Sequence, residues 1–218
     1  MTLGTAVVRA SGPDIVLEDG RTVRLAGIET TGTPELPRGA TVTLKRISGV
    51  PETDRYGRVS AHLFVEPEGR WLQADLLARG QARVSRVGDT TCARALLSQE
   101  HAARAAKLGL WGEPYYVIND AGDLAGVLKS RGRLALVEGR VLSVRESGGT
   151  IYVNFGRRWS EDFTVTIAKR SERAFTAAGL TPKMLEGRRV RIRGWIEERG
   201  GPWVEAAAPE QIEVLERN

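Results

Sequence analysis

Apolar and polar residues alternate in short runs along the first half of the chain, and turn-forming residues separate the runs. Such alternation is typical of half-buried strands. The pattern predicts five strands, at residues 5–10, 14–17, 23–28, 41–47 and 59–65. Five short strands joined by tight turns predict a small Greek-key barrel of the OB type.

Two helices are predicted after this barrel. Residues 71–79 form a short helix that Gly80 ends, because glycine readily adopts the left-handed conformation found just after many helices. Residues 92–108 place apolar side chains at helical spacing, and Thr91 is the expected N-cap.

The second half of the chain is again rich in predicted strands. Little periodicity is found in residues 114–132, which predicts a connector between a first domain at 1–113 and a second at 133–218. Strands are predicted at 134–145, 151–155, 163–168, 189–197 and 203–206, with a helix at 171–178. Glycine pairs at 148–149 and 200–201 predict hairpin turns. The predicted fold class is therefore mainly β with a few helices, as two OB-type five-stranded barrels in tandem.

Composition narrows the class of protein. The chain has 218 residues, of which 41% are hydrophobic and 27% charged, so it is globular rather than disordered. A net charge of +5 permits nucleic-acid binding without requiring it. Cys92 is the only cysteine, which excludes an internal disulfide and a cysteine-rich metal site. No apolar run approaches the length of a membrane span.

The sequence leaves the compartment open. No signal peptide precedes the first predicted strand. If an upstream export segment has been removed, the protein is periplasmic or secreted, and otherwise it is cytoplasmic.

Two arginines are the first candidates for a functional site. Arg24 is flanked by Val23 and Leu25, which places it on a strand with a stiff backbone. Arg58 follows a predicted turn at the start of another strand. A planar guanidinium with several donors suits a phosphate or a carboxylate. Two such groups, with an acid between them in the sequence, indicate a phosphodiester site.

The same residues carry a resemblance to a known family. Residues 24–30 read Arg-Leu-x-Gly-Ile-Glu-Thr, residues 54–58 read Asp-Arg-Tyr-Gly-Arg, and further matching stretches follow at 71–84 and 109–111. These motifs, in this order, resemble the staphylococcal nuclease (thermonuclease) family. The resemblance covers roughly half of the chain. It implies a barrel with two helices after it, and calcium-dependent hydrolysis of DNA or RNA.

The resemblance also assigns roles to single residues. It implies that Arg24 and Arg58 hold the phosphate, and that Glu29 and Thr30 supply calcium ligands. The remaining aspartate ligand of the family falls on Pro13, and Asp14 is one residue away. A one-residue shift along a strand turns a side chain to the other face, so the calcium site is expected to be damaged.

The general base of the family has no counterpart at its own position. Thr31 and Gly32 stand there without a carboxylate, and Glu35 is the candidate for a displaced base. Tyr56 is retained, either as a nucleic-acid contact or as a turn residue that packs on the barrel. Inheritance of the site predicts that Arg24, Glu29 and Arg58 converge on one cleft, where Glu29 pairs with one of the two arginines.

Aromatic and basic residues are interleaved in the second domain. Tyr152, Arg157, Arg158 and Trp159 are candidates for binding single-stranded nucleic acid, because aromatic rings stack on bases and arginines bind phosphates. In the alternative, the aromatic residues belong to the core and the charges to a solvated face. Arginines at 188, 189, 191 and 193 predict a basic outer face along one strand.

Three functions compete at this point. In the preferred one, the catalytic set is degenerate and the protein binds single-stranded nucleic acid or a protein partner. In the second, it is an active calcium-dependent endonuclease with a rearranged active-site loop. In the third, it is a structural or assembly protein without a nucleic-acid role.

Overall fold

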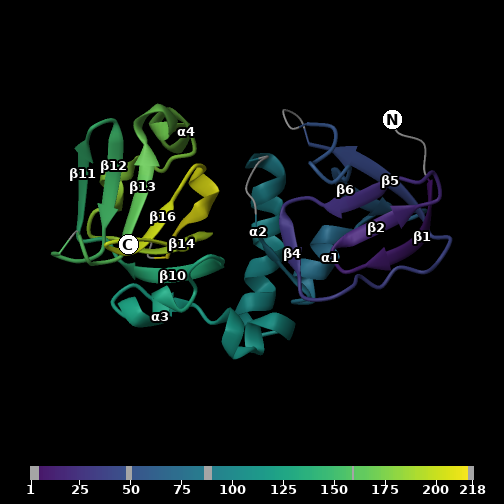
Figure 1. The fold of residues 1–218 in the computed structure, drawn as a ribbon, viewed down its shortest axis with the longest axis horizontal. Helices are drawn as coiled ribbons and strands as arrows, with labels where there is room; N and C mark the ends of the chain where they lie inside the picture. Colours follow the sequence, from purple (N-terminus) through teal and green to yellow (C-terminus); the bar gives the residue numbers. More distant parts are fainter. Residues whose placement is uncertain (1–4, 48–50, 86–89, 159, 216–218) are drawn as a thin grey trace. The chain divides into compact units, whose positions relative to one another are not determined.

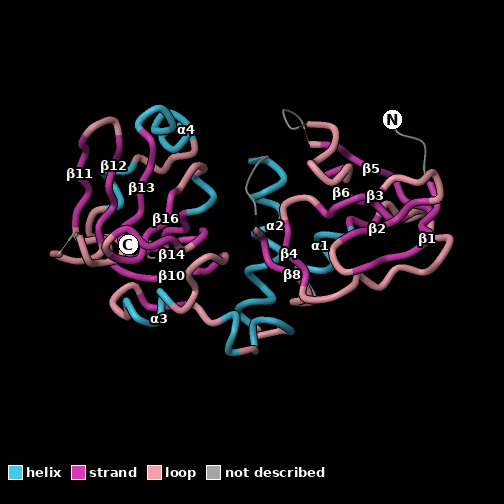
Figure 2. The backbone as a smooth tube through the Cα atoms, in the orientation of Figure 1, coloured by secondary structure: helices cyan, strands magenta, loops and turns pink. Residues whose placement is uncertain are grey.

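The computed structural model describes residues 5–47, 51–85, 90–158 and 160–215. The chain divides into two compact units, Met1–Tyr115 and Tyr116–Asn218. Each unit is mainly β-structure with a small number of helices (Figures 1 and 2). The predicted fold class is confirmed for the first unit, whose strands close into a five-stranded barrel.

The barrel of the first unit follows the chain closely. Its strands are β1 (Thr5–Ser11), β2 (Asp14–Leu17), β3 (Thr22–Leu25), β5 (Thr41–Arg46) and β6 (Val59–Val65), with the short β7 (Arg70–Trp71) beside β6. Neighbours pair antiparallel in the order β3-β2-β1-β5-β6, and a parallel pairing of β6 with β3 closes the ring. Alternate residues such as Val23 and Leu25 are buried inside the ring, so the intervening Arg24 lies on its outer surface.

The third predicted strand is broken, which corrects the prediction of one strand over 23–28. Gly27 has a φ of 76°, a conformation that interrupts a strand and that glycine adopts without strain. The chain turns there into a separate strand, β4 (Ile28–Thr30), which pairs with β8 (Ala82–Val84). Glu29 therefore lies on a different sheet from Arg24.

Two helices follow the barrel, as predicted. They are α1 (Leu72–Ala78) and α2 (Thr90–Ala105). Helix α2 therefore begins one residue before Thr91, the expected N-cap. The side chain of Thr91 is not among those that the structure describes. Gly80 ends the first helical segment with a φ of 67°. Its backbone crosses that of Gly109 closely, and the Leu110 amide donates to the Gly80 carbonyl at 2.9 Å.

The second unit contains a five-stranded sheet and a four-stranded sheet. Its strands are β9 (Asn119–Asp120), β10 (Leu134–Arg140), β11 (Ser143–Ser147), β12 (Thr150–Asn154), β13 (Thr164–Ala168), β14 (Arg189–Trp195), β15 (Glu197–Arg199), β16 (Gly201–Glu205) and β17 (Ile212–Val214). The antiparallel hairpins lead from β11 to β12 and β13, and β13 pairs parallel with β16. Strand β16 also pairs antiparallel with β15, which ends this sheet, and the other sheet has the order β17-β14-β10-β9. Helix α4 (Glu172–Ala177) lies between β13 and β14 in the chain.

Three expectations about the second unit need correction. The predicted connector is partly folded, because it contains β9, which pairs parallel with β10, and α3 (Leu124–Leu128). The predicted strands 134–145 and 189–197 each divide into two, since the chain passes from one sheet to the other near Val141 and Ile196. Strand β17 was not predicted.

Short 3₁₀ helices occur in both units, at Gly109–Gly112, Pro114–Tyr116, Lys169–Ser171, Pro182–Leu185 and Pro209–Gln211.

Candidate functional site

Arg58 is held rigidly by a turn that its own sequence builds. One carboxylate oxygen of Asp54 accepts the backbone amides of Tyr56 and Arg58, at 2.8 and 3.0 Å. The other accepts from Nε of Arg58 at 2.9 Å and lies 2.7 Å from Nη2. Aspartate commonly stabilises turns in this way. The Arg58 guanidinium is therefore oriented before any ligand arrives.

The same contacts shift the pKa values of Asp54 and Arg58. Hydrogen bonds from the Arg58 side chain and backbone lower the pKa of Asp54 to about 2. The pKa of Arg58 is raised, chiefly by its hydrogen bond with Asp54 and then by Asp14. Both groups are charged at any physiological pH.

This pairing makes a direct prediction about pH. Replacing Arg58 with Gln should return the pKa of Asp54 from about 2 toward its ordinary value near 4, as followed by NMR titration of the carboxyl carbon. Because the pKa is lowered in the folded chain, the stabilisation is complete above about pH 4 and is lost as the pH falls toward 2. Arg46→Gln, which removes an arginine paired with Glu52, is the control and should leave Asp54 unchanged. An unchanged Asp54 pKa in Arg58→Gln would contradict the assignment.

Asp14 brings the two arginines of the motif to one surface. It lies directly opposite Arg24 in the β2–β3 ladder, so both side chains project from the same outer face. Nη1 of Arg58 donates to Oδ2 of Asp14 at 3.1 Å. The structure thus gathers Arg24, Arg58 and Asp14 around one part of the barrel, and the expected turn of Asp14 to the opposite face is wrong.

Arg24 differs from Arg58 in its contacts. Within the described residues, Arg24 makes no hydrogen bond or ion pair, and it is exposed. Oδ1 of Asp14 is buried and accepts no hydrogen bond from any described residue. The donors of Arg24 therefore remain available to an incoming anion, beside a second arginine that is already oriented.

Tyr56 is positioned by the same turn. Its ring is 65% exposed, and the guanidinium carbons of Arg55 and Arg58 lie 4.8 and 4.9 Å from its centroid. These are cation–π contacts. The tyrosine does not pack into the barrel core, so an aromatic surface stands next to the Arg58 guanidinium.

Glu29 does not join this group, contrary to the expected pairing with Arg24 or Arg58. Because β4 pairs with β8, Glu29 faces Arg83, and its Oε2 lies 2.8 Å from both Nε and Nη2 of that arginine. Among the described residues Glu29 forms no ion pair with the other two arginines. Arg83 is only 4% exposed in its side chain, whereas Glu29 is half exposed.

The loop after β4 contains Glu35, the predicted displaced base. Glu35 is exposed there and makes no hydrogen bond or ion pair within the described part of the chain. The amide of Gly12 donates to Oγ1 of Thr33 at 2.9 Å, which ties this loop to the β1–β2 turn. Thr30 lines a small pocket of about 90 Å³ at the base of the loop, with its hydroxyl oxygen buried and without a hydrogen bond to any described residue.

The calcium ligands implied by the resemblance do not form a set that suits the ion. Calcium prefers six to eight oxygens, several of them charged. Here the Asp14 carboxylate is bound to Arg58 and the Glu29 carboxylate to Arg83. Among the described residues no three His, Cys, Asp or Glu side chains gather where they could hold a metal. The residues present therefore do not fit calcium in this arrangement.

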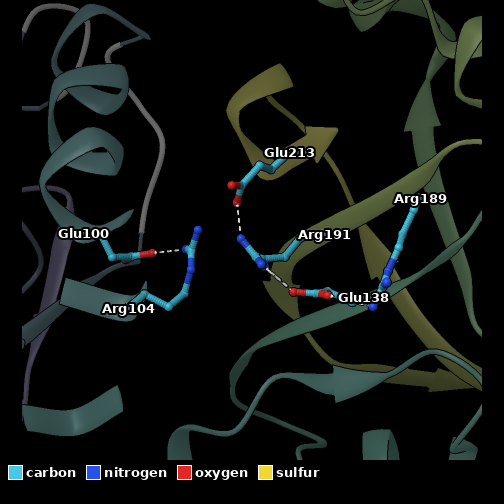
Figure 3. A network of polar contacts seen from close by, with 6 residues as sticks. All are labelled: Glu100, Arg104, Glu138, Arg189, Arg191 and Glu213. Atoms are coloured by element: carbon cyan, nitrogen blue, oxygen red, sulfur yellow. Dashed lines mark hydrogen bonds and ion pairs between the residues drawn. The ribbon is translucent and has the colours of Figure 1, made fainter. Parts of the chain in front are cut away.

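The predicted basic face of the second unit is largely neutralised. Arg191 lies between Glu138 and Glu213, with nitrogen–oxygen distances of 2.5 and 2.8 Å, and Arg189 also reaches Glu138 at 3.4 Å (Figure 3). Arg193 is buried rather than on an outer face. The β14 arginines therefore stabilise the sheet and do not present the expected free basic surface.

A similar structural role explains the remaining pair in Figure 3, which belongs to α2 of the first unit. Glu100 is fully buried, and it accepts from Arg104 at 2.8 Å and from the backbone amide of Val84 at 2.6 Å. This carboxylate is occupied in joining α2 to β8.

The four residues of the second unit that were predicted to bind nucleic acid differ in their surroundings. Tyr152 is half-buried on β12, and Arg157 is exposed without a hydrogen bond or ion pair to any described residue. Arg158 contacts Glu161 at 3.1 Å. Trp159 lies outside the described residues. Tyr152 and Arg157 line one groove, which also includes Arg145 and Leu142.

Arg145 was not among the sequence candidates, although the signal was present. A two-residue turn at Gly148 and Gly149 sets the register of the hairpin, so Arg145 must lie opposite Tyr152. Asp54 was likewise recognised only as part of a motif. Its place two residues before Tyr56 is a common signal for a turn closed by an aspartate side chain.

The closed five-stranded barrel with two helices after it defines an OB-type architecture. Residues 35–113 match the model of a family described as staphylococcal nuclease homologue, so the first unit carries a domain of this family. The predicted family is confirmed. The match includes Glu35, Tyr56 and Arg58 and begins after Arg24. No curated protein matches the chain.

Proposed function

We propose that the first unit binds a phosphodiester of single-stranded nucleic acid without cutting it. The observation that carries this proposal is the placement of Arg24 and Arg58 on one face around Asp14, with Arg58 oriented by Asp54 and Arg24 unpaired within the described residues. Two guanidinium groups supply the donors that a phosphate needs. Tyr56 adds an exposed ring on which a base can stack.

Hydrolysis requires more than this arrangement offers. An attacking water must be positioned and deprotonated, and in a nuclease of this type a metal ion stabilises the developing charge. Thr31 and Gly32 carry no carboxylate, and Glu29 is bound to Arg83. The site therefore supports binding of the phosphate rather than its hydrolysis. A protein partner with an acidic or phosphorylated segment is the competing ligand.

Among the described residues no helix is long and apolar enough to cross a membrane. The proposal concerns the phosphate-binding face alone.

The proposal is tested with the full chain and a fluorescent single-stranded oligonucleotide of twelve thymidines. The double variant Arg24→Gln with Arg58→Gln should bind about 10-fold more weakly, because charged hydrogen bonds to the phosphate are lost. The slope of log K against log salt should fall by about 1.4, which corresponds to two contacts on a single strand. Fluorescence anisotropy between low and moderate salt measures both quantities.

The matched control removes two other arginines from the same unit. Arg46→Gln with Arg79→Gln makes the same change in net charge, and neither arginine contacts Asp14 or Asp54. Affinity should change much less than in the Arg24/Arg58 variant. Equal losses in the two double variants would show that net charge alone, rather than this face, attracts the strand, and the proposal would fail.

A further inference from the structure

A groove on the second unit combines an aromatic ring with unpaired arginines. It has a volume of about 700 Å³, within the range of ordinary ligand sites. Ser143, Arg145 and Tyr152 line it from the β11–β12 hairpin, and Arg157 lines it from the segment after β12. We propose that this groove is a second contact site for single-stranded nucleic acid, in which a base stacks on Tyr152 and flanking phosphates bind Arg145 and Arg157.

The strand register places these side chains on one face. Arg145 pairs with Tyr152, and Ser143 pairs with Asn154. The alternate residues Val144, Ile151 and Val153 are buried in the core. The groove therefore lies over the outer face of the hairpin, where a planar base has access to a ring.

The arginines of this groove differ from several others in the second unit, because they are not paired with acids in the described part of the chain. Elsewhere in the unit, arginines such as Arg131, Arg191 and Arg199 are paired with glutamates. Among the described residues Arg145 and Arg157 form no hydrogen bond or ion pair, and no carboxylate lines the groove. An anionic ligand therefore meets two guanidinium groups that have no hydrogen-bonded acid among the described residues. The nearby Glu186 carboxylate, which interacts with Arg145 only through its charge, is bound to Lys183.

Tyr152 is held in place rather than free to rotate. Its ring contacts Trp203 with centroids 6.1 Å apart and planes at 81°, and Arg199 lies 4.9 Å from the centroid of the Trp203 ring. A fixed aromatic ring loses little freedom when a base stacks on it. The ring, the arginines and the hydroxyl of Ser143 together suit a base with its phosphates better than an acidic peptide, which offers no flat ring to stack.

The groove shares its ligand class with the proposed function but none of its residues, so the two proposals can fail separately. The full chain is titrated with the twelve-thymidine oligonucleotide as above. Tyr152→Ala should weaken binding by roughly 5- to 150-fold, the range expected for one stacked base. Tyr152→Phe keeps the ring and should stay within about 2-fold of the unmodified chain.

Arg145→Gln with Arg157→Gln should lower the salt slope by about 1.4, as two lost contacts on a single strand require. The matched control is Arg170→Gln with Arg173→Gln. These arginines also lack an ion pair within the described residues and line a different pocket beside α4. The control should leave the slope much closer to that of the unmodified chain. Circular dichroism of each variant confirms that it is folded.

The outcomes separate the two sites. If the Arg24/Arg58 variant loses affinity while Tyr152→Ala and the Arg145/Arg157 variant do not, the groove proposal is overturned and the proposed function stands. If only the groove variants lose affinity, the proposed function fails and the groove remains. Displacement of the oligonucleotide by poly-glutamate at equal charge concentration, with no effect of Tyr152→Ala, would assign the groove to an acidic peptide instead and overturn the inference.

Discussion

Incubated with calcium and single-stranded DNA, the unmodified chain is expected to cut no faster than it does with a chelator. The resemblance places the general base where Thr31 and Gly32 stand, and the loss of such a base is expected to remove a factor of roughly 10² to 10⁴ in rate. The resemblance also places a charged calcium ligand at Pro13, and the lack of that charge, together with the binding of Glu29 to Arg83, is expected to weaken calcium binding. These losses act on one transition state, so they do not simply add.

A gain-of-function variant distinguishes a missing catalytic group from a misfolded site. Pro13→Asp with Gly32→Glu restores both carboxylates, and no atom lies within 4 Å of a Cβ built on Gly32. We expect calcium-dependent cutting to rise toward the factor of roughly 10² to 10⁴ that a general base provides. The control is Pro13→Asn with Gly32→Gln, which has similar size without the charges.

One result would show that the protein is an active nuclease and not only a nucleic-acid-binding protein. If the unmodified chain cuts DNA with calcium at ordinary enzyme rates, and Arg58→Ala abolishes the cutting, then the protein is an active endonuclease. Glu35 would be the first candidate for the base, and Glu35→Gln should then lower the rate by about 10²-fold or more. If the chain neither cuts nor binds single-stranded nucleic acid, the result would favour the third alternative, a structural or assembly protein.

Gly80→Ala is expected to cost about 3–4 kcal/mol of the free energy of unfolding of the first unit. A Cβ at Gly80 would lie 2.2 Å from the Leu108 carbonyl oxygen and 2.6 Å from its carbon, and both atoms belong to the backbone. The φ of 67° adds strain for any residue with a Cβ. Urea unfolding measures the loss, and hydrogen exchange of the amides in α1 and α2 locates it.

Gly69→Ala separates the clash from the backbone strain. Gly69 has a φ of 63°, but no atom lies within 4 Å of an added Cβ. This variant should cost only about 1 kcal/mol, which is the effect of the conformation alone. Similar costs in the two variants would show that the crossing of the Gly80 and Gly109 backbones relaxes easily and does not constrain the helices.

The amino-acid sequence determined most of the first barrel. Alternation placed Val23 and Leu25 inside and Arg24 outside, because successive side chains on a strand point to opposite faces. The Asp-Arg-Tyr-Gly-Arg motif at 54–58 determined a turn that orients its own arginine, since the hydrogen bonds that Asp54 accepts all come from within the motif. The order of motifs was sufficient to predict the family.

Only the tertiary structure decided which charges meet. Arg83 and Glu29 are 54 residues apart, and they pair because Gly27 redirects the chain into β4 beside β8. Asp14 reaches Arg58 across 44 residues because β2, β3 and β6 are neighbours in the closed barrel. The arginines of β14 looked like a binding face in the sequence, but Glu138 and Glu213 on the neighbouring strands neutralise Arg191. Local patterns fix which face a side chain takes, whereas its partner depends on which strands lie side by side, and that is set by closure of the barrel.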